Sequence, residues 1–367
     1  MTLELTQEQK DTGWQVKKLG EVSSITMGQS PHGRNVAGEH IGLPLLNGPT
    51  EFTAFSPIPV KWTEQITKVA MKNDILFCVR GSTTGRMNIA DQQYVIGRGI
   101  ASLRGATLPD TRYLYFTIQR YLPSLLQRAT GSTFPNISGA QLNDFEIPWP
   151  PDSVRNYITE VLGSVSDKIE ANSRLLDSLY KLLHELYILR TSQSSQEISL
   201  TGIADFVNGK AFTKNATGTG RMVVRIAELN GGPGASTVYN EIPDVEEKHL
   251  VNPGEILMSW SGTLGVFLWS REQAIVNQHI FKVIPKSGYS MGVVYCAIQS
   301  VTEKFQAIAQ DQATTMGHIK RRDLETPVLV PSNTEELENL FSLISTLEQE
   351  NNTLAETSDR LIRYLIG

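Results

Sequence analysis

The side chains best suited to chemistry lie in one short loop, where Arg80 and Arg86 flank Ser82, Thr83 and Thr84. Two glycines in this loop let the backbone approach a partner closely. Arginine and hydroxyl side chains hydrogen-bond the exposed edges of bases in DNA grooves. The loop therefore predicts DNA recognition, although a structural β-turn with solvent-facing arginines would have the same composition.

A similar loop occurs in the second half of the chain and contains Ser261 and Thr263. Polar residues also precede matching apolar segments, with Arg98 in the first half and Gln278 and His279 in the second. These residues differ between the halves, as two readers of different DNA sequences would require. A structural turn is the alternative for this second loop as well.

Basic residues complete the set of candidate DNA contacts. Lys210 and Lys214 lie beside a glycine-rich loop, and the triplet Lys320–Arg322 suits either a phosphate clamp or the solvated start of a helix. None of these residue types identifies a particular base. The candidate DNA-binding residues are Arg80, Ser82, Thr83, Thr84, Arg86, Arg98, Lys210, Lys214, Ser261, Thr263, Gln278, His279, Lys320, Arg321 and Arg322.

Catalytic motifs are not recognisable in the chain. An adenine methyltransferase needs Asn/Asp-Pro-Pro-aromatic, whereas Pro148–Asp152 has a different order, and no phosphate loop ending in Gly-Lys-Ser/Thr occurs. Pro243 and Asp244 with Glu246–Lys248 weakly resemble a nuclease carboxylate–lysine site, but they lie so close together that a solvated charged loop explains them better. The six histidines and two cysteines show no metal-ligand spacing. We therefore expect no catalytic residues, no metal site and no cofactor bound by this chain.

The candidate residues belong to a sequence that occurs nearly twice. Asp74–Leu76 recurs as Glu255–Leu257, and Tyr115–Gln119 recurs as Tyr295–Gln299, so that both repeats are displaced by about half the length of the chain. Solenoid repeats are only about 20–50 residues long. The longer period therefore predicts a duplicated unit, in which a domain is followed by a helix.

Each half is expected to be a mixed α/β domain. Short apolar segments such as Asp74–Val79 and Tyr94–Leu103 predict strands, and the segments 113–128 and 293–309 predict helices. Strands and helices do not alternate regularly, which argues against a doubly wound sheet. The predicted fold is α+β, with two similar domains joined by two long helices. The predicted boundaries are 1–150, 151–192, 193–331 and 332–367.

Two heptad patterns predict an antiparallel coiled coil between the long helices. The first comprises Ile158, Leu162, Val165, Ile169, Asn172, Leu176, Leu179, Leu183 and Leu186, and the second comprises Leu337, Leu340, Ile344, Leu347, Asn351, Leu354, Ser358, Leu361 and Leu365. When Asn172 faces Asn351, all nine layers come into register, and this asparagine pair would fix the register. At 1.5 Å per residue the first pattern spans about 42 Å, as a ruler between the domains would. The alternative is two amphipathic helices, each packed on its own domain.

Charge and composition limit the class of protein. The net charge is −5, and the segment 332–367 accounts for it, since acidic residues far outnumber basic ones there. The two halves are close to neutral, which neither requires nor excludes DNA binding. Cys78 and Cys296 are expected to be buried and unpaired, as in a reducing cytoplasm. No signal sequence is recognisable and no apolar run reaches the roughly 18 residues of a membrane span, so we expect no membrane partner.

The chain resembles the specificity subunits of type I restriction–modification systems. The similarity covers almost the whole chain and depends on the order of the repeated segments and helices rather than on one short motif. The first copy of the repeated segments is typical of the family. The second copy is less similar, because it lacks the Pro-Asn pair and has one terminal proline where the first copy has two. The segments that carry the resemblance are Trp14–Val22, Asn73–Thr83 and its copy, Gly131–Ile137, Ile147–Pro151, Thr314–Ile319 and Val328–Pro331.

The resemblance implies two target-recognition domains, each reading one half of an interrupted DNA sequence across an unread spacer. It further implies docking of two modification subunits, which use S-adenosylmethionine to methylate adenine N6, and of restriction subunits, which use ATP and Mg²⁺ to cleave DNA. The chain itself would supply recognition and assembly without catalysis. The alternatives are a fused or separate methyltransferase or nuclease, and a scaffold that binds only proteins.

Overall fold

The computed structural model describes residues 3–38, 40–130, 135–214, 216–242, 244–311 and 317–367. Two compact units can be distinguished. The first unit contains Met1–Glu170 and Ala355–Gly367, and the second contains Ala171–Leu354. The sequence-based division treated each long helix as a separate segment, whereas here each helix contributes residues to both units. Parts of the motifs discussed above, at 131–134, 243 and 314–316, lie outside the described residues.

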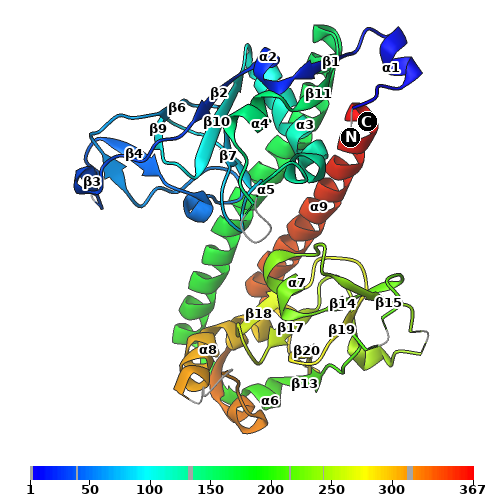
Figure 1. Cartoon of the computed structure of the whole chain (residues 1–367). Helices are drawn as coiled ribbons and strands as arrows, with labels where there is room; N and C mark the ends of the chain where they lie inside the picture. Colours follow the sequence, from blue (N-terminus) through cyan, green and yellow to red (C-terminus); the bar gives the residue numbers. More distant parts are fainter. Residues whose placement is uncertain (1–2, 39, 131–134, 215, 243, 312–316) are drawn as a thin grey trace. The chain divides into compact units, whose positions relative to one another are not determined.

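The first unit contains a four-stranded antiparallel sheet in the order β2-β10-β7-β8 and a mixed five-stranded sheet in the order β3-β5-β4-β9-β6 (Figure 1). A short pair, β1 (Gln15–Lys18) with β11 (Glu146–Trp149), joins the beginning of the unit to its end. The strands of the two larger sheets are β2 (Ser23–Met27), β3 (Val36–Ala37), β4 (Leu43–Leu46), β5 (Trp62–Thr63), β6 (Val69–Ala70), β7 (Ile75–Cys78), β8 (Met87–Ile89), β9 (Tyr94–Ile96) and β10 (Ile100–Gly105).

The second unit repeats this topology, except that β3 has no counterpart in its mixed sheet. Its antiparallel sheet has the order β13-β20-β17-β18, its mixed sheet has the order β15-β14-β19-β16, and β12 pairs with β21. In both units the mixed sheet contains one parallel pair, β4 with β9 and β14 with β19. The strands are β12 (Ser195–Ser199), β13 (Ala204–Asn208), β14 (Arg221–Val224), β15 (Val238–Asn240), β16 (Leu250–Val251), β17 (Ile256–Ser259), β18 (Gly265–Leu268), β19 (Ala274–Val276), β20 (Ile280–Pro285) and β21 (Pro327–Pro331). The duplication predicted from sequence is therefore a duplication of the fold.

One amphipathic helix in each unit covers the antiparallel sheet. In the first unit, α3 (Leu108–Leu126) places Leu114 and Ile118 in a core with residues of β7 and β10. Each such buried side chain contributes about 1.5–3 kcal/mol. The helix begins before the predicted Tyr113 because Thr107 and Asp110 form a capping box. Its counterpart, α8 (Met291–Asp311), confirms the second predicted helix.

Short helices and turns connect these elements. They are α1 (Gln7–Asp11), α2 (Leu19–Val22), α4 (Gly139–Asn143), α6 (Leu200–Ile203), α7 (Ile226–Gly231), and the 3-10 turns η1 (Gly33–Asn35), η2 (Pro49–Glu51), η3 (Glu247–His249) and η4 (Arg321–Glu325).

The two long helices, α5 (Asp152–Gln193) and α9 (Glu335–Ile366), run antiparallel within each unit. In the second unit, Arg190 near the end of α5 bonds Glu336 at the start of α9. All residues of the two heptad patterns are buried or half-buried, which confirms the predicted faces. The α+β fold with paired long helices is thus the one predicted.

The predicted register is correct to within one residue. Asn172 Nδ2 donates to Glu350 (2.8 Å) and Asn351 Nδ2 donates to Ser173 Oγ (3.1 Å), one position on either side of the predicted Asn172–Asn351 pair. These bonds pair the amide nitrogens of both asparagines within a largely apolar helix interface.

The end of α9 buries more than the heptad pattern predicts. Ile362 and Ile366 are almost fully buried, whereas the predicted Leu361 and Leu365 are only half-buried. The reason is that this end of α9 packs in one cluster with α3, through Tyr113, as well as with α5. Because α9 has a second neighbouring helix here, a wider face of it is buried than in a coiled coil of two helices.

Candidate nucleic-acid interface

Three chain segments meet at one edge of the antiparallel sheet in the first unit. They are the loop 79–86 after β7, the turn 97–99 before β10 and the segment 135–138 before α4, and together they form what we term the loop edge. Four backbone hydrogen bonds hold the loop edge and join it to the end of β2. They are Gly28 N to Ile100 O (2.9 Å), Val79 N to Gly99 O (2.9 Å), Gly81 N to Pro135 O (3.2 Å) and Ile137 N to Val79 O (3.0 Å).

The second unit builds its loop edge in the same way, from residues 260–264, 277–279 and 317–320. The corresponding bonds are Gly209 N to Ile280 O (2.9 Å), Trp260 N to His279 O (3.1 Å), Gly262 N to Gly317 O (3.1 Å) and Ile319 N to Trp260 O (3.1 Å). Each bond joins two residues that the sequence repeat aligns with the two residues joined by the corresponding bond in the first unit. The candidate loops found in sequence therefore occupy equivalent places.

A glycine at the end of the first strand of each sheet makes this geometry possible. A Cβ on Gly28 would collide with the carbonyl oxygen of Gly97, and a Cβ on Gly209 would collide with that of Asn277. Only glycine allows the strand end to pass so close to the turn. The loop edges are consequently fixed by backbone packing, and their side chains are free to differ.

The candidate residues of the first unit separate into two groups. Arg86 donates to the carbonyl oxygens of Pro49 (3.2 Å) and Phe52 (2.7 Å). The single hydroxyl hydrogen of Thr84 is shared between the carbonyl oxygens of Gly81 and Pro135, both 2.7 Å from Oγ1. These two residues therefore hold the loop in place. The other candidate side chains of this loop edge, those of Arg80, Ser82, Thr83 and Arg98, are exposed.

In the second unit, the structure corrects one assignment. Ser261 is only 5% exposed, because its backbone forms a bridge with His318 and turns the side chain inward. Its hydroxyl is not presented to a partner, which removes it as a base-reading residue. Thr263, Gln278 and His279 are exposed as expected.

Sequence reasoning did not select Trp260, which corresponds to Val79. Its ring lies 4.9 Å from that of His279, between ring centroids, and its Nε1 donates to Asn208 Oδ1 (2.8 Å). The half-buried indole thus supports the turn that carries His279. Only its position next to the predicted loop could have indicated this role.

The basic candidates are placed in two ways. Lys320–Arg322 follow Ile319 directly and are exposed, and Lys320 is the N-cap residue of η4. Lys214 is also exposed, whereas Lys210 forms an ion pair with Glu246 (2.8 Å). Hydrogen bonds from Lys210 and Lys248 lower the pKa of Glu246 to about 2. Glu246 and Lys248 therefore belong to an exposed ion-pair group, as the charged-loop interpretation predicted.

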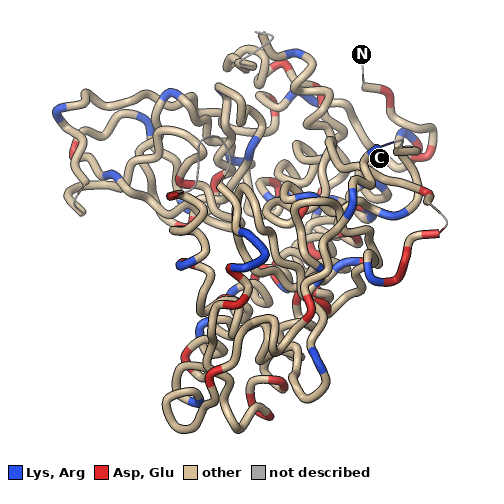
Figure 2. The backbone as a smooth tube through the Cα atoms, turned by 90° about the horizontal axis from the view of Figure 1, so that it is seen from below, with Lys and Arg blue, Asp and Glu red and all other residues tan. Residues whose placement is uncertain are grey.

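Lysine and arginine are interspersed with aspartate and glutamate along both units (Figure 2). This distribution agrees with halves that are close to neutral. Phosphate attraction alone would then contribute little, and contacts from individual side chains matter more.

Other features of the described residues do not form a second candidate site. Cys78 and Cys296 are buried and unpaired, and burial raises the pKa of Cys296 to about 12. Within the described ranges, no three His, Cys, Asp or Glu side chains come together as metal ligands. None of the described helices is both long and apolar enough to cross a membrane.

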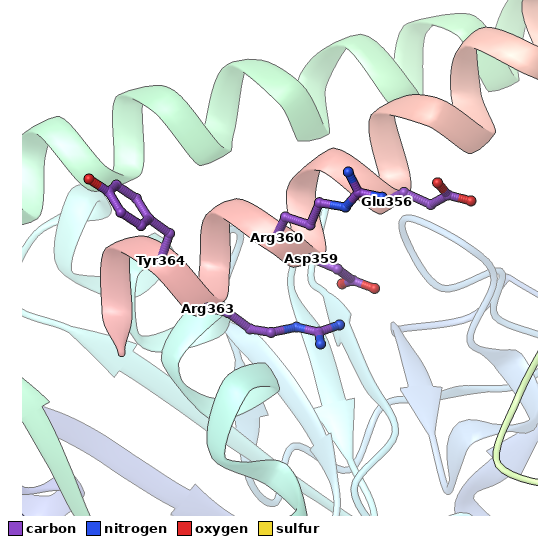
Figure 3. Close-up of a pocket in the computed structure, with 5 residues that line it drawn as sticks. All are labelled: Glu356, Asp359, Arg360, Arg363 and Tyr364. Carbon is purple, nitrogen blue, oxygen red and sulfur yellow. The ribbon is translucent and has the colours of Figure 1, made fainter. Parts of the chain in front are cut away.

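A shallow hollow on α9 is lined by that helix alone (Figure 3). Its side chains fan out from one helix face and mix two carboxylates with two guanidinium groups. Such a face resembles a solvated charged surface rather than a site with converging groups. The lining residues are Glu356, Asp359, Arg360, Arg363 and Tyr364.

Comparison with known proteins places these features in a family. The family model of the type I restriction modification DNA specificity domain matches residues 11–181 and 193–357, one match in each half of the chain. The chain is 31% identical over 171 residues to a protein of Methanocaldococcus jannaschii described as the type I restriction enzyme MjaX specificity subunit, covering 46% of this chain and 40% of that protein. It is 26% identical over 191 residues to the MjaIX specificity subunit of the same organism, covering 47% of this chain and 43% of that protein.

The aligned segments thus span less than half the length of these relatives. In fold, the chain is similar to the crystal structure of a type I restriction–modification S subunit from M. genitalium, with a TM-score of 0.61 and 16% sequence identity. That similarity covers 100% of this chain and 98% of the other.

Proposed function

The chain belongs to the family of type I restriction–modification DNA specificity domains, and from this premise we propose that it recognises the DNA target of such a system. One observation carries the proposal. The same four backbone hydrogen bonds build the loop edge in both units, while the exposed side chains on it differ. A constant scaffold with different polar side chains suits the recognition of two different DNA half-sites.

Each unit would read one half-site through its loop edge. In the first unit the proposed contacts are Arg80, Ser82, Thr83 and Arg98, with Thr84 and Arg86 as supports. In the second unit they are Thr263, Gln278, His279 and the basic triplet Lys320–Arg322, to which Lys210 and Lys214 add phosphate contacts. Arginine and amide groups suit base edges, whereas lysines suit phosphates.

The long helices would serve assembly. We propose that α5 and α9 set the unread spacer between the half-sites and contribute to the docking of two modification subunits. Those subunits would bring S-adenosylmethionine, and restriction subunits would bring ATP and Mg²⁺. The chain itself would bind none of these cofactors, since the motifs that hold them are not recognisable in its sequence.

Reconstitution from purified subunits tests this function. The modification subunit alone, with S-adenosylmethionine and DNA, should not methylate a defined sequence. Addition of this chain should produce N6-methyladenine at one sequence with two separated parts. The chain without the modification subunit should transfer no methyl group, which separates recognition from catalysis. Methylation by the chain alone, or unchanged methylation after its addition, would contradict the proposal.

A further inference from the structure

We propose that Arg98 and Gln278 occupy the same reading position in the two units, where Arg98 selects guanine in one half-site and Gln278 selects adenine in the other. The inference rests on the proposed function, because it assigns bases to a DNA target that the chain is proposed to read. It goes further in naming one residue in each unit and the base that each would read.

The two residues are structurally equivalent. Gly97 directly follows β9, and its N donates to the O of Leu46 (2.7 Å), the last residue of the parallel strand β4. Asn277 directly follows β19, and its N donates to the O of Val224 (3.2 Å), the last residue of the parallel strand β14. The residue that follows is Arg98 in the first unit and Gln278 in the second. The two side chains therefore leave the same turn of the same sheet.

Their backbone amides are anchored while their side chains are exposed. Arg98 N donates to Ser30 Oγ (3.3 Å) and Gln278 N donates to Lys210 O (2.9 Å). Among the described residues, no hydrogen bond or ion pair engages the guanidinium of Arg98 or the side-chain amide of Gln278. Both groups thus keep their hydrogen-bonding capacity for a partner.

The turns that carry these residues are rigidly supported. Ile96 and Ile100 on either side of the first turn are fully buried, as are Val276 and Ile280 beside the second. A polar side chain on a turn held by buried strands can be positioned well enough for base recognition. In the second unit, His279 lies next to Gln278 and its ring contacts that of Trp260 in a tilted arrangement, which fixes this turn further.

The chemistry of the two side chains determines the bases. The guanidinium of arginine donates two parallel hydrogen bonds to O6 and N7 of guanine. The amide of glutamine accepts from N6 and donates to N7 of adenine. The other loop position does not offer this contrast, because the counterpart of Arg80 is the buried Ser261. The turn position, by contrast, presents an exposed base-reading side chain in both units, and the two side chains differ.

An exchange of residues tests the assignment. Methylated adenines would be mapped in cells that carry the unmodified chain, Arg98→Gln or Gln278→Arg. Arg98→Gln should change one guanine to adenine in one half-site and leave the other half-site intact. Gln278→Arg should change one adenine to guanine in the other half-site. Unchanged half-sites, or changes at other bases, would overturn the assignment, whereas a map that does not depend on the chain at all would refute the proposed function itself.

A binding measurement decides the outcome if the exchanged variants lose methylation. The purified complex with the modification subunit would be titrated with the target duplex and with a duplex in which the assigned guanine is replaced by adenine. The unmodified complex should lose about tenfold or more in affinity on this replacement. The complex with Arg98→Ala should bind both duplexes equally, and an equal loss in both complexes would overturn the assignment.

Arg112→Ala is the matched control. It removes one arginine from the same unit, but Arg112 lies on α3 and pairs with Asp167 (3.6 Å). This variant should keep the full preference for guanine. A reduced preference in the control would show that the effect reflects the charge of the unit rather than a contact from Arg98, and would overturn the assignment.

Discussion

At the scale of single residues, the arginines of the first loop edge serve different roles. Arg86 bonds the carbonyl groups of Pro49 and Phe52 and thereby ties the loop after β7 to the turn η2 of the neighbouring sheet. Arg80 and Arg98 remain exposed. Support of the loop and the proposed DNA recognition therefore fall to different arginines of one loop edge.

Replacement of these arginines by alanine should separate the two roles. Arg86→Ala removes two hydrogen bonds and should cost about 1 kcal/mol, because the guanidinium is itself exposed. Arg80→Ala should change the free energy of unfolding by less than about 0.5 kcal/mol but weaken DNA binding. Thermal unfolding and DNA titration of both variants measure these effects. Equal losses of stability would contradict the distinction.

The sequence identifies the loop but not the direction of each side chain. Ser261 and Thr263 are equally plausible from composition, yet Ser261 faces inward because its backbone pairs with His318, far along the chain. Likewise, the carbonyl partners of Arg86 belong to a distant part of the chain, before β5. Such long-range contacts leave no local pattern, so sequence reasoning could not exclude these residues.

At the scale of elements, the helices were the most predictable part of the fold. Heptad spacing is local, and it correctly predicted the buried faces of α5 and α9 and their register to within one residue. It did not predict the burial of Ile362 and Ile366, since that depends on packing with α3. The short strands of the mixed sheets, some only two residues long, carry too little periodicity to be predicted reliably.

The helix interface of the second unit contains a titratable contact. Tyr180 on α5 donates a hydrogen bond to Glu348 on α9. Burial raises the pKa of Glu348, and the hydrogen bonds from Tyr180 and Ser270 oppose this rise. The folded protein therefore holds this proton more tightly than the unfolded chain does, for which the ordinary value is 4.5.

This contact predicts a pH dependence of stability. The stabilisation from protonated Glu348 is complete below the unfolded pKa and is lost as the pH rises through the raised folded pKa. The Glu348→Gln variant has no carboxyl group to ionise at this position and does not lose this stabilisation. Its melting temperature should therefore rise relative to that of the unmodified protein as the pH increases over the same range. Tyr180→Phe removes an opposing hydrogen bond and should move the transition to higher pH. A difference in melting temperature that does not vary with pH would contradict this account.

At the scale of the whole molecule, the chain consists of two units that share one topology apart from β3 and that carry two different loop edges. The repeat that is visible in the sequence relates both the strand orders and the hydrogen bonds of the loop edges. Architecture was therefore predictable from the repeat. The bases that each unit is proposed to read would depend on exposed side chains, which a repeat does not determine.

If the helices set the unread spacer, their length should control it. Insertion of seven residues at facing positions in α5 and α9 preserves the heptad phase and adds about 10 Å, or about three base pairs. The methylated sequence should then have a longer spacer between unchanged half-sites. Altered half-sites with an unchanged spacer would contradict the role of the helices as a ruler.

The most direct test of DNA recognition by the two units is a map of N6-methyladenine across the genome in cells with and without this gene. We predict that one methylated sequence, made of two different half-sites and an unread spacer, is present only in cells that carry the gene. The same methylated adenines in both kinds of cell would contradict the account.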